Sequence, residues 1–130
     1  MCIFCKIASK EIESFVVYED DKIVAFLDIR PVSRGHTLVI PKEHYESILD
    51  MPIELAKDLT KAIQIVCEKL KRLGAEGFNI ITNINKIAGQ EIMHAHVHVI
   101  PRYSGEESKP ISFGKPIECN LEEVHKALKD

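Results

Sequence analysis

Long hydrophobic segments are missing from this sequence of 130 residues. The longest uninterrupted apolar run is Ile23–Leu27, far shorter than the roughly 20 residues that a membrane-spanning helix needs. A strong charge imbalance is missing too: the formal net charge is −3, which argues against nucleic acid or a membrane surface as the partner. A small anionic ligand remains compatible with this composition, because a few local groups can outweigh a weak net charge.

Internal repeats, low-complexity segments and a linker before about residue 104 are also absent, and the length suits one domain. Lys6 and Glu11 interrupt the N-terminal segment too early for a signal peptide. We therefore expect a cytoplasmic protein. Its four cysteines would be reduced there.

Short runs rich in β-branched and aromatic residues predict strands. They cover residues 15–19, 23–28, 36–41, 78–83 and 91–100. Between the third and fourth runs, apolar residues recur at steps of three and four over residues 51–73, which predicts an amphipathic helix. Pro52 suits the first turn of this helix and Gly74 suits the residue just past its end.

A second, short helix is predicted to begin after Asn120, whose side chain can cap it, with Glu123 completing a capping box. The order of strands, one long helix and further strands predicts an α+β fold with a mainly antiparallel sheet of about five strands.

Three of the six histidines, His94, His96 and His98, alternate with apolar residues in the last predicted strand. Alternate residues of a strand point to one face, and the outer two Cα atoms would lie roughly 13 Å apart. Three rings cannot converge on one ion over that span, so at most two neighbours serve one metal. The alternative is a row of surface histidines, but clustered rings oppose one another's protonation, so we favour a functional row with divided roles.

The segment from His94 to Ile100 matches the signature His-φ-His-φ-His-φ-φ, where φ is apolar. It resembles the histidine triad (HIT) family, most closely the small Hint-like prokaryotic branch that carries an N-terminal Cys-x-x-Cys. Four further segments stand in the family's order: residues 3–7, 25–29, 35–44 and 88–90. The resemblance implies the HIT-like fold, with a HIT domain over residues 1–103 and a C-terminal tail, residues 104–130, packing on that domain.

The resemblance also implies a purine nucleotide hydrolase or transferase that acts at the α-phosphate. An adenosine phosphoramidate would give AMP through a nucleotidyl-histidine intermediate. By position, His96 would be the nucleophile and His98 would bind the α-phosphate, while His36 would orient and polarise the row. A neutral imidazole attacks phosphorus well when its other nitrogen carries a fixed proton.

The substrate contacts implied by the resemblance fall into three groups. Asp28 would hold the ribose hydroxyls, although a turn aspartate is the alternative. The base would be enclosed by Phe4, Ile7, Phe26 and Ile29, and the phosphate would meet Asn83, Gly89 and Gln90. Without the resemblance, Phe26 and Ile29 would be interpreted as core residues.

Two positions depart from the family. Asn85 stands where Gly is common, and Asn is the usual second choice for a left-handed backbone conformation, so we expect the loop to keep its shape. Glu91 stands near the leaving group, where many members have Ser or Thr. A carboxylate there would repel a polyphosphate or accept a proton from an amine, which predicts a preference for phosphoramidates over dinucleoside polyphosphates.

A structural zinc ion is implied by the same branch, held by Cys2, Cys5, His44 and His94. The alternative is an empty site with reduced thiols. Cys67 and Cys119 are interpreted as packing or incidental residues.

The family also implies a homodimer whose sheets join edge to edge. Three other functions stay open at this point: a dinucleoside polyphosphate hydrolase, a non-catalytic nucleotide-binding regulatory module and a Cys-x-x-Cys redox protein.

Overall fold

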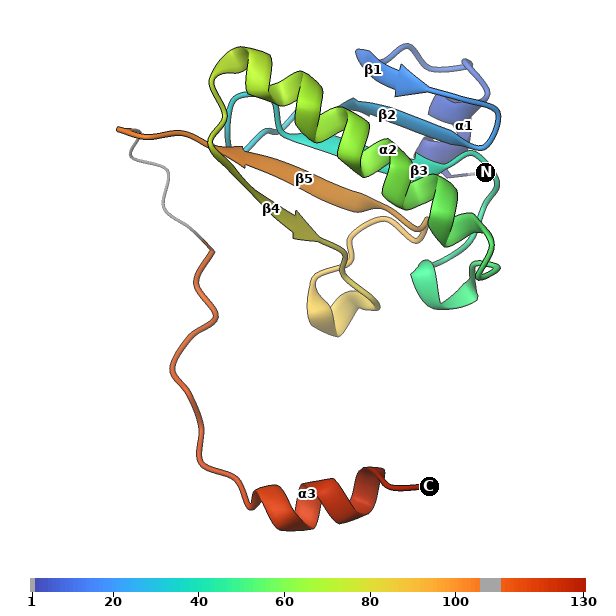
Figure 1. The fold of residues 1–130 in the computed structure, drawn as a ribbon. Helices are drawn as coiled ribbons and strands as arrows, with labels where there is room; N and C mark the ends of the chain where they lie inside the picture. The colour runs from blue at the N-terminus through green and yellow to red at the C-terminus, as the bar shows by residue number, and fades with distance from the viewer. Residues whose placement is uncertain (1, 106–110) are drawn as a thin grey trace.

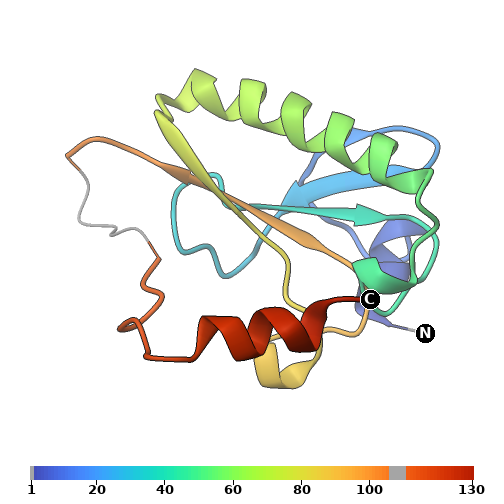
Figure 2. The same ribbon diagram turned by 60° about the horizontal axis from the view of Figure 1, so that its bottom comes forward.

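The computed structural model describes residues 2–105 and 111–130 and confirms the α+β prediction (Figure 1). One antiparallel sheet has the strand order β1-β2-β3-β5-β4. Its strands are β1 (Val16–Glu19), β2 (Ile23–Leu27), β3 (Thr37–Pro41), β4 (Gly77–Ile81) and β5 (Val97–Arg102). Helices cover both faces of this sheet, α2 on one and α1 on the other (Figures 1 and 2).

Helix α2 (Leu55–Leu70) covers one face with the predicted apolar stripe. Its buried residues recur every three or four positions: Leu55, Leu59, Ala62, Val66 and Leu70. They pack on alternate strand residues of that face, and burying each large side chain contributes about 1.5–3 kcal/mol. A 3-10 turn, η2 (Lys71–Leu73), continues the helix to Gly74, whose φ of 97° ends it as predicted. Pro52 lies just before α2 rather than in its first turn.

Helix α1 (Ile3–Ala8) covers the opposite face, and the sequence reasoning missed it. Six residues are too few to display a helical period. Phe4 and Ile7 hold the helix in place by packing on four buried strand residues, Val24, Phe26, Leu38 and Ile40. The Cys2 Sγ accepts a hydrogen bond from the Cys5 N–H at the start of α1, so both cysteines are fixed at one end of the helix.

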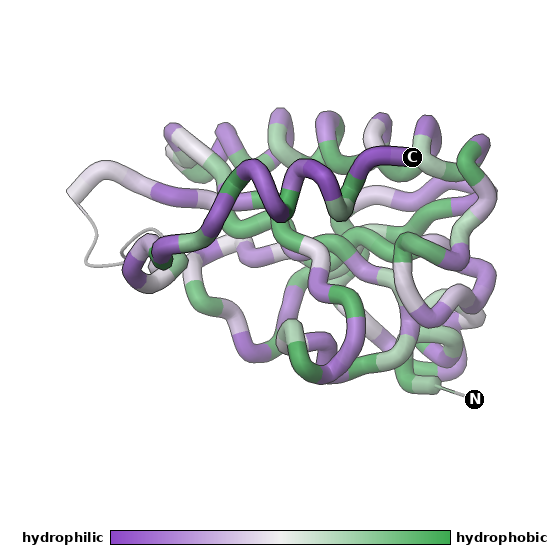
Figure 3. Tube along the Cα trace, turned by 90° about the horizontal axis from the view of Figure 1, so that it is seen from below, coloured by the Kyte–Doolittle hydropathy of each residue, from purple (hydrophilic) through white to green (hydrophobic). Residues whose placement is uncertain are grey.

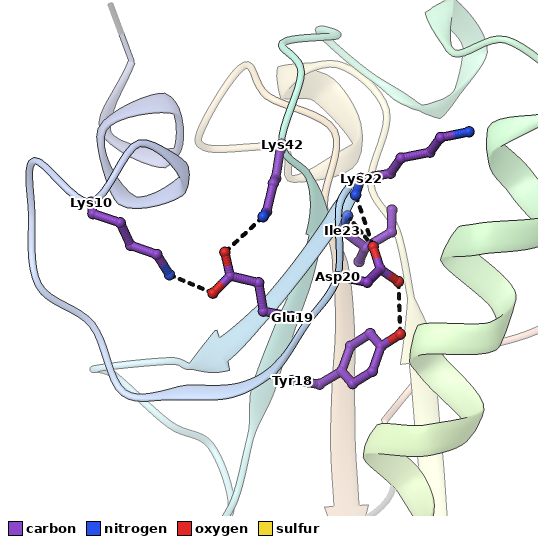
Figure 4. Close-up of polar contacts among 7 residues, drawn as sticks. All are labelled: Lys10, Tyr18, Glu19, Asp20, Lys22, Ile23 and Lys42. Atoms are coloured by element: carbon purple, nitrogen blue, oxygen red, sulfur yellow. Dashed lines mark hydrogen bonds and ion pairs between the residues drawn. The ribbon is translucent and has the colours of Figure 1, made fainter.

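The turn between β1 and β2 is fixed by the Asp20 carboxylate, as Figure 4 shows. It accepts hydrogen bonds from the Lys22 and Ile23 N–H groups at 2.8 Å and from the Tyr18 hydroxyl at 2.7 Å. Glu19 pairs with Lys10 at 2.6 Å and with Lys42 at 2.7 Å (Figure 4). These two lysines hold the pKa of the Glu19 carboxyl below its usual range and tie the segment after α1 to the end of β3.

The prediction of a strand over residues 91–100 is wrong for its first six residues, because β5 begins at Val97. The chain leaves the sheet there: the Ala95 N–H donates to the Tyr45 carbonyl at 2.6 Å, and the His94 N–H donates to the Ile92 carbonyl at 2.9 Å. A connection containing the 3-10 turn η3 (Lys86–Ala88) therefore joins β4 to β5. The histidine row begins in this connection and ends in β5.

The C-terminal helix α3 (Leu121–Leu128) begins as predicted, because the Asn120 side chain accepts the Glu123 N–H at 3.1 Å. Figure 1 shows α3 well apart from the sheet, and Figure 3 shows both hydrophilic and hydrophobic residues along it. All side chains of residues 112–130 are exposed. The packing of residues 104–130 on the HIT domain therefore stays a prediction. No helix within the described residues is long and apolar enough to cross a membrane.

Candidate active site and metal centre

The histidine row divides between two clusters of side chains, as the spacing argument predicts. His94 lies with Cys2, Cys5 and His44, while His98 lies with His36 and Asp28. His96 stands between the clusters: its ring contacts the His98 ring at a centroid distance of 5.1 Å. The row lies on the sheet face that α1 covers, because His98 pairs with Leu38 of that face.

The first cluster has nearly tetrahedral geometry. Its four atoms are the Sγ atoms of Cys2 and Cys5 and the Nδ1 atoms of His44 and His94. All six distances among them lie between 3.2 and 3.5 Å. The centre of such a tetrahedron lies about 2.1 Å from each atom, close to the bond lengths of zinc to histidine nitrogen and slightly below those to sulfur.

Hydrogen bonding also prepares His94 as a ligand. Its Nε2 lies 2.8 Å from the Pro41 carbonyl oxygen, which can only accept, so the ring proton sits on Nε2 and Nδ1 keeps its lone pair. Burial lowers the pKa of His94, which keeps the ring neutral. Burial and the neighbouring Cys2 raise the pKa of the Cys5 thiol, so a cation is needed to hold the Cys5 sulfur as a thiolate. The donor set fits a divalent metal.

The same logic fixes the proton of His96. Its Nδ1 lies 2.6 Å from the His94 carbonyl oxygen and must therefore donate, which leaves Nε2 unprotonated. The Phe4 ring packs edge-on against both His94 and His96, at centroid distances of 5.9 and 5.1 Å. His96 is thus a buried ring held in the tautomer that a nucleophilic nitrogen requires.

In the second cluster, a chain of donors runs from the backbone to His98. The Val32 N–H donates to His36 Nδ1 at 3.1 Å, so the His36 proton sits on Nε2. His36 Nε2 lies 3.0 Å from His98 Nδ1 and donates to it, which places the His98 proton on Nε2. His98 thus has one N–H left to offer a ligand in the adjoining cavity.

Both rings of this chain are held neutral. Burial lowers the pKa of His36, and burial together with the nearby His96 and His36 lowers the pKa of His98 to about 4. Asp28 opposes both shifts, because its Oδ2 lies 3.6 Å from His36 Nε2. A neutral ring that donates from Nε2 can bind a phosphate oxygen without carrying a charge itself.

The second cluster does not suit a metal, although its three ligand atoms lie within 4.8 Å of one another. A metal on His36 would need the Nε2 lone pair, and the ring proton would then move to Nδ1. The Val32 N–H already points at Nδ1 from 3.1 Å, so two hydrogens would face each other. Because the His36 proton is fixed on Nε2, the second cluster is suited to hydrogen bonding, whereas the first is suited to binding a metal.

A cavity of about 620 Å³ lies beside the second cluster and His96. This volume is typical of small-molecule sites. Most of the predicted substrate and catalytic residues line it: Phe4, Ile7, Phe26, Asp28, Ile29, His36, Asn83, Gly89, Glu91, His96 and His98. Sequence reasoning missed other lining residues, chiefly Ile3, Ile12, Phe15, Arg30 and Val32.

Gln90 is the predicted residue that the structure does not bring to the cavity. Its side chain is buried and spans the loop instead. The oxygen accepts the Asn85 N–H at 2.8 Å, and the nitrogen donates to the Glu46 carbonyl at 2.6 Å and the Ile92 carbonyl at 3.1 Å. Asn85 has a positive φ of 73°, but its ψ of 156° lies outside the left-handed region that was predicted for it. Gln90 shapes the loop that presents Asn83 and Gly89.

The structure combines an α+β sheet with a row of histidines that runs from a Cys2His2 cluster to a cavity. The cavity is large enough for a nucleotide, and these features together define the class of protein. The HIT domain model matches residues 9–105, and the chain belongs to the HIT family. An uncharacterized HIT-like protein of Methanocaldococcus jannaschii is 47% identical over 129 residues, which cover 99% of each chain.

Two further relatives bear on the site. An adenosine 5′-monophosphoramidase of Saccharomyces cerevisiae is 39% identical over 131 residues, covering 98% of this chain and 80% of that protein. The crystal structure of a Zn-bound histidine triad family protein from Mycobacterium smegmatis matches with a TM-score of 0.78 and 38% identity, over 90% of this chain and 84% of that one.

Proposed function

We propose that this protein hydrolyses or transfers purine nucleotides at the α-phosphate, and that adenosine phosphoramidates are substrates that release AMP. The observation that carries this proposal is the fixed tautomer of His96, whose Nδ1 donates to the His94 carbonyl at 2.6 Å. The unprotonated Nε2 can attack phosphorus. The similarity to a yeast adenosine 5′-monophosphoramidase supports the same reaction class.

The proposed reaction has two displacements. Nε2 of His96 forms a bond to the α-phosphorus while the phosphorus–nitrogen bond breaks, and the amine leaves with the electron pair and a proton. Water then attacks the nucleotidyl-histidine and releases AMP. His98 donates its Nε2–H to an α-phosphate oxygen, and His36 holds His98 in the donating tautomer through their 3.0 Å contact.

The rest of the cavity would receive the nucleoside and the phosphate. Phe4 and Phe26 pack edge to face with centroids 5.6 Å apart and form part of an apolar wall for the base, together with Ile7 and Ile29. Asp28 would accept the ribose hydroxyls. Gly89, with a φ of 100°, and Asn83 also line the cavity and would meet the phosphate.

We further propose that Cys2, Cys5, His44 and His94 hold structural zinc. The near-regular tetrahedron and the lone pair left on His94 Nδ1 support this, as does the Zn-bound relative. When bound, zinc would join the start of α1 to the histidine row. Thiolate ligands need a reducing compartment, in agreement with the predicted cytoplasmic localisation.

Intact-protein mass spectrometry tests the reaction directly. Brief mixing with an AMP phosphoramidate and quenching in alkaline denaturant, in which the phosphorus–nitrogen bond survives, should reveal an added mass of one nucleoside monophosphate. Peptide mapping at alkaline pH should place it on His96. Binding of AMP without any adduct or AMP release would indicate the non-catalytic nucleotide-binding module instead. Activity that depends on Cys2 and Cys5 but not on His96 would indicate the redox alternative.

A dinucleoside polyphosphate hydrolase is the close alternative, and Glu91 discriminates between the two. Glu91 is exposed and lines the cavity, so its charge would oppose a polyphosphate leaving group. We expect a higher kcat/KM for phosphoramidates with an amine leaving group than for dinucleoside polyphosphates. In E91S this repulsion is lost, so the ratio of the two kcat/KM values should fall by roughly 10-fold. Comparable efficiencies of the wild-type protein on both classes would contradict the expectation.

We also propose a homodimer formed through the edge of β4. The two edges of the sheet are β1 and β4. The pairing of β1 with β2 shifts register between Val16 and Tyr18, whereas β4 pairs regularly and exposes Ile80 at its free edge. An open regular edge favours pairing with another chain. Light scattering at micromolar concentration should give twice the chain mass, and a charge at Ile80 (I80K) should shift it to the monomer.

A further inference from the structure

Asp28 lies where it can act on two partners at once. It follows β2, and its Oδ1 accepts the Arg30 N–H at 2.9 Å, which fixes the carboxylate in the turn. Its Oδ2 lies 3.6 Å from His36 Nε2, and its side chain is only 19% exposed. A ribose contact explains an accepting group at the cavity wall. It does not explain why the carboxylate faces the proton of a buried histidine.

That proton decides what the whole donor chain does. With hydrogen on His36 Nε2, the chain donates from Val32 N–H to His36, from His36 to His98 and from His98 to the cavity. With hydrogen on Nδ1 instead, His36 Nε2 would accept from His98 Nδ1, and His98 would lose the proton on its Nε2. The tautomer of His36 therefore sets whether His98 offers a donor or a lone pair.

We propose that Asp28 is a positioning residue for the phosphate end of the row, and that its carboxylate holds the His36 proton on Nε2 so that His98 presents Nε2–H to the phosphate. The proposal rests on the proposed function and gives Asp28 a second role beside the ribose. The two roles are compatible, because a carboxylate accepts at several lone pairs, and Oδ1 and Oδ2 have different partners.

The surrounding charges favour this role for Asp28. His36 faces Asp28, His98 and, at longer range, Arg102, while His98 faces His96, His36 and Asp28. Among the described residues, Asp28 is therefore the only anion that acts on these two rings. A negative charge near Nε2 stabilises an N–H there, as the buried aspartate of a catalytic triad orients its histidine. The Val32 N–H acts on the opposite nitrogen in the same direction.

Nitrogen NMR of the imidazole rings tests the tautomer without any substrate. In ¹⁵N-histidine-labelled wild-type protein, His36 should show a protonated Nε2 and an unprotonated Nδ1. In D28N, the two nitrogens should move part of the way toward averaged shifts, because the charge is lost and the Val32 N–H alone then opposes a proton on Nδ1. The Asn oxygen still accepts the Arg30 N–H and preserves the turn. D21N, which removes an exposed carboxylate from the β1–β2 turn, is the matched control and should retain the wild-type spectrum.

Kinetics on two substrates separates the two roles of Asp28. The substrates are an adenosine phosphoramidate and its 2′,3′-dideoxy analogue, which has no ribose hydroxyls. D28N should lower kcat by about 10-fold or more on both substrates, since the donor to phosphate is weakened in each. A residue that contacts only the ribose would raise KM on the first substrate and change nothing on the second.

Wild-type His36 shifts and an unchanged kcat of D28N on the dideoxy analogue would overturn the proposal. D28E restores a carboxylate with a longer arm and should recover part of both signals; a D28E protein no better than D28N in either measurement would also count against it. If the wild-type protein turned over neither substrate, the proposed function would fail, whereas the NMR comparison would still decide the role of Asp28.

Discussion

Two clusters at the ends of one histidine row contain similar groups and do different chemistry. Cys2, Cys5, His44 and His94 direct four lone pairs at one centre, with all distances between 3.2 and 3.5 Å. The cluster of Asp28, His36 and His98 also brings its ligand atoms close together, yet a proton occupies the space between His36 and His98. Proximity alone therefore does not define a metal site.

Backbone groups make the difference between the clusters. The Pro41 carbonyl takes the far proton of His94 and frees its near nitrogen, whereas the Val32 N–H occupies the far nitrogen of His36 and forces the proton to the near one. One acceptor and one donor from the main chain thus select a ligand at one end and a donor at the other. Helix α1 also connects the metal cluster to His96, because Cys2 caps the helix, Cys5 lies in it and its Phe4 ring contacts His96.

Replacing His96 should have the largest effect on AMP release, because this residue forms the proposed covalent bond. His96 belongs to neither cluster. We expect H96N to lower AMP release from an adenosine phosphoramidate by at least about 1,000-fold, since the nucleophile is lost. Metal content and AMP affinity should stay within a few-fold of wild type. Retained turnover in H96N would show that the covalent step does not use this ring.

Breaking the metal cluster should have the next largest effect. C5S removes one thiolate ligand, so metal should fall from one equivalent per chain toward none, with a loss of roughly 3 kcal/mol in the free energy of unfolding. Elemental analysis and denaturant unfolding measure both quantities. C67S is the matched control: Cys67 is half-buried on α2, outside the cluster, and burial is the main cause that raises the pKa of its thiol. Equal metal content in C5S and wild type would contradict the assignment.

The elements with a repeating pattern were predictable from the sequence. Helix α2 displays five buried residues at helical spacing, and β2 and β3 are short, continuous apolar runs bounded by turns. Helix α1 has no such signal, because six residues complete less than two turns. The strand over residues 91–96 was wrong for a different reason. Histidines and apolar residues do alternate there, but the segment is a connection. Its backbone hydrogen-bonds to the Tyr45 carbonyl rather than to a neighbouring strand.

At the site, the sequence predicted which residues gather but not their protons. The row and the Cys-x-x-Cys were visible as patterns, whereas Asp28, His36 and His44 were named only through the resemblance to the HIT family. The protons depend on Pro41 and Val32, whose main-chain groups meet the rings only after folding. Gln90 shows the same limit. The resemblance implied that it meets the phosphate, and the structure instead buries its side chain within the loop.

A smaller effect is expected on the pKa of His98. It tests whether His36 controls this ring, which is the feature that separates the second cluster from the metal cluster. The pKa of His98 is lowered to about 4, so folding favours the neutral ring: the resulting contribution to stability is present above about pH 6.5 and is lost as the pH falls toward 4. In H36L, the donor and the charge repulsion from His36 are removed and Asp28 remains, so the His98 pKa should rise by about one unit or more. NMR titration of labelled histidines measures this shift; an unchanged pKa would show that burial alone sets it.

The smallest expected effect is a change in the free energy of unfolding at Asn85, which lies in the loop beside the cavity rather than in the metal cluster. Its φ of 73° and ψ of 156° form a backbone conformation that residues other than glycine rarely adopt, and it lies in the loop that presents Asn83 and Gly89. N85G should raise the free energy of unfolding by about 1 kcal/mol, because relief of strain exceeds the added freedom of the unfolded chain. N85A keeps a Cβ and should not stabilise. Denaturant unfolding of both variants measures the difference, and equal stability of Gly and Ala would mean that position 85 stores no strain.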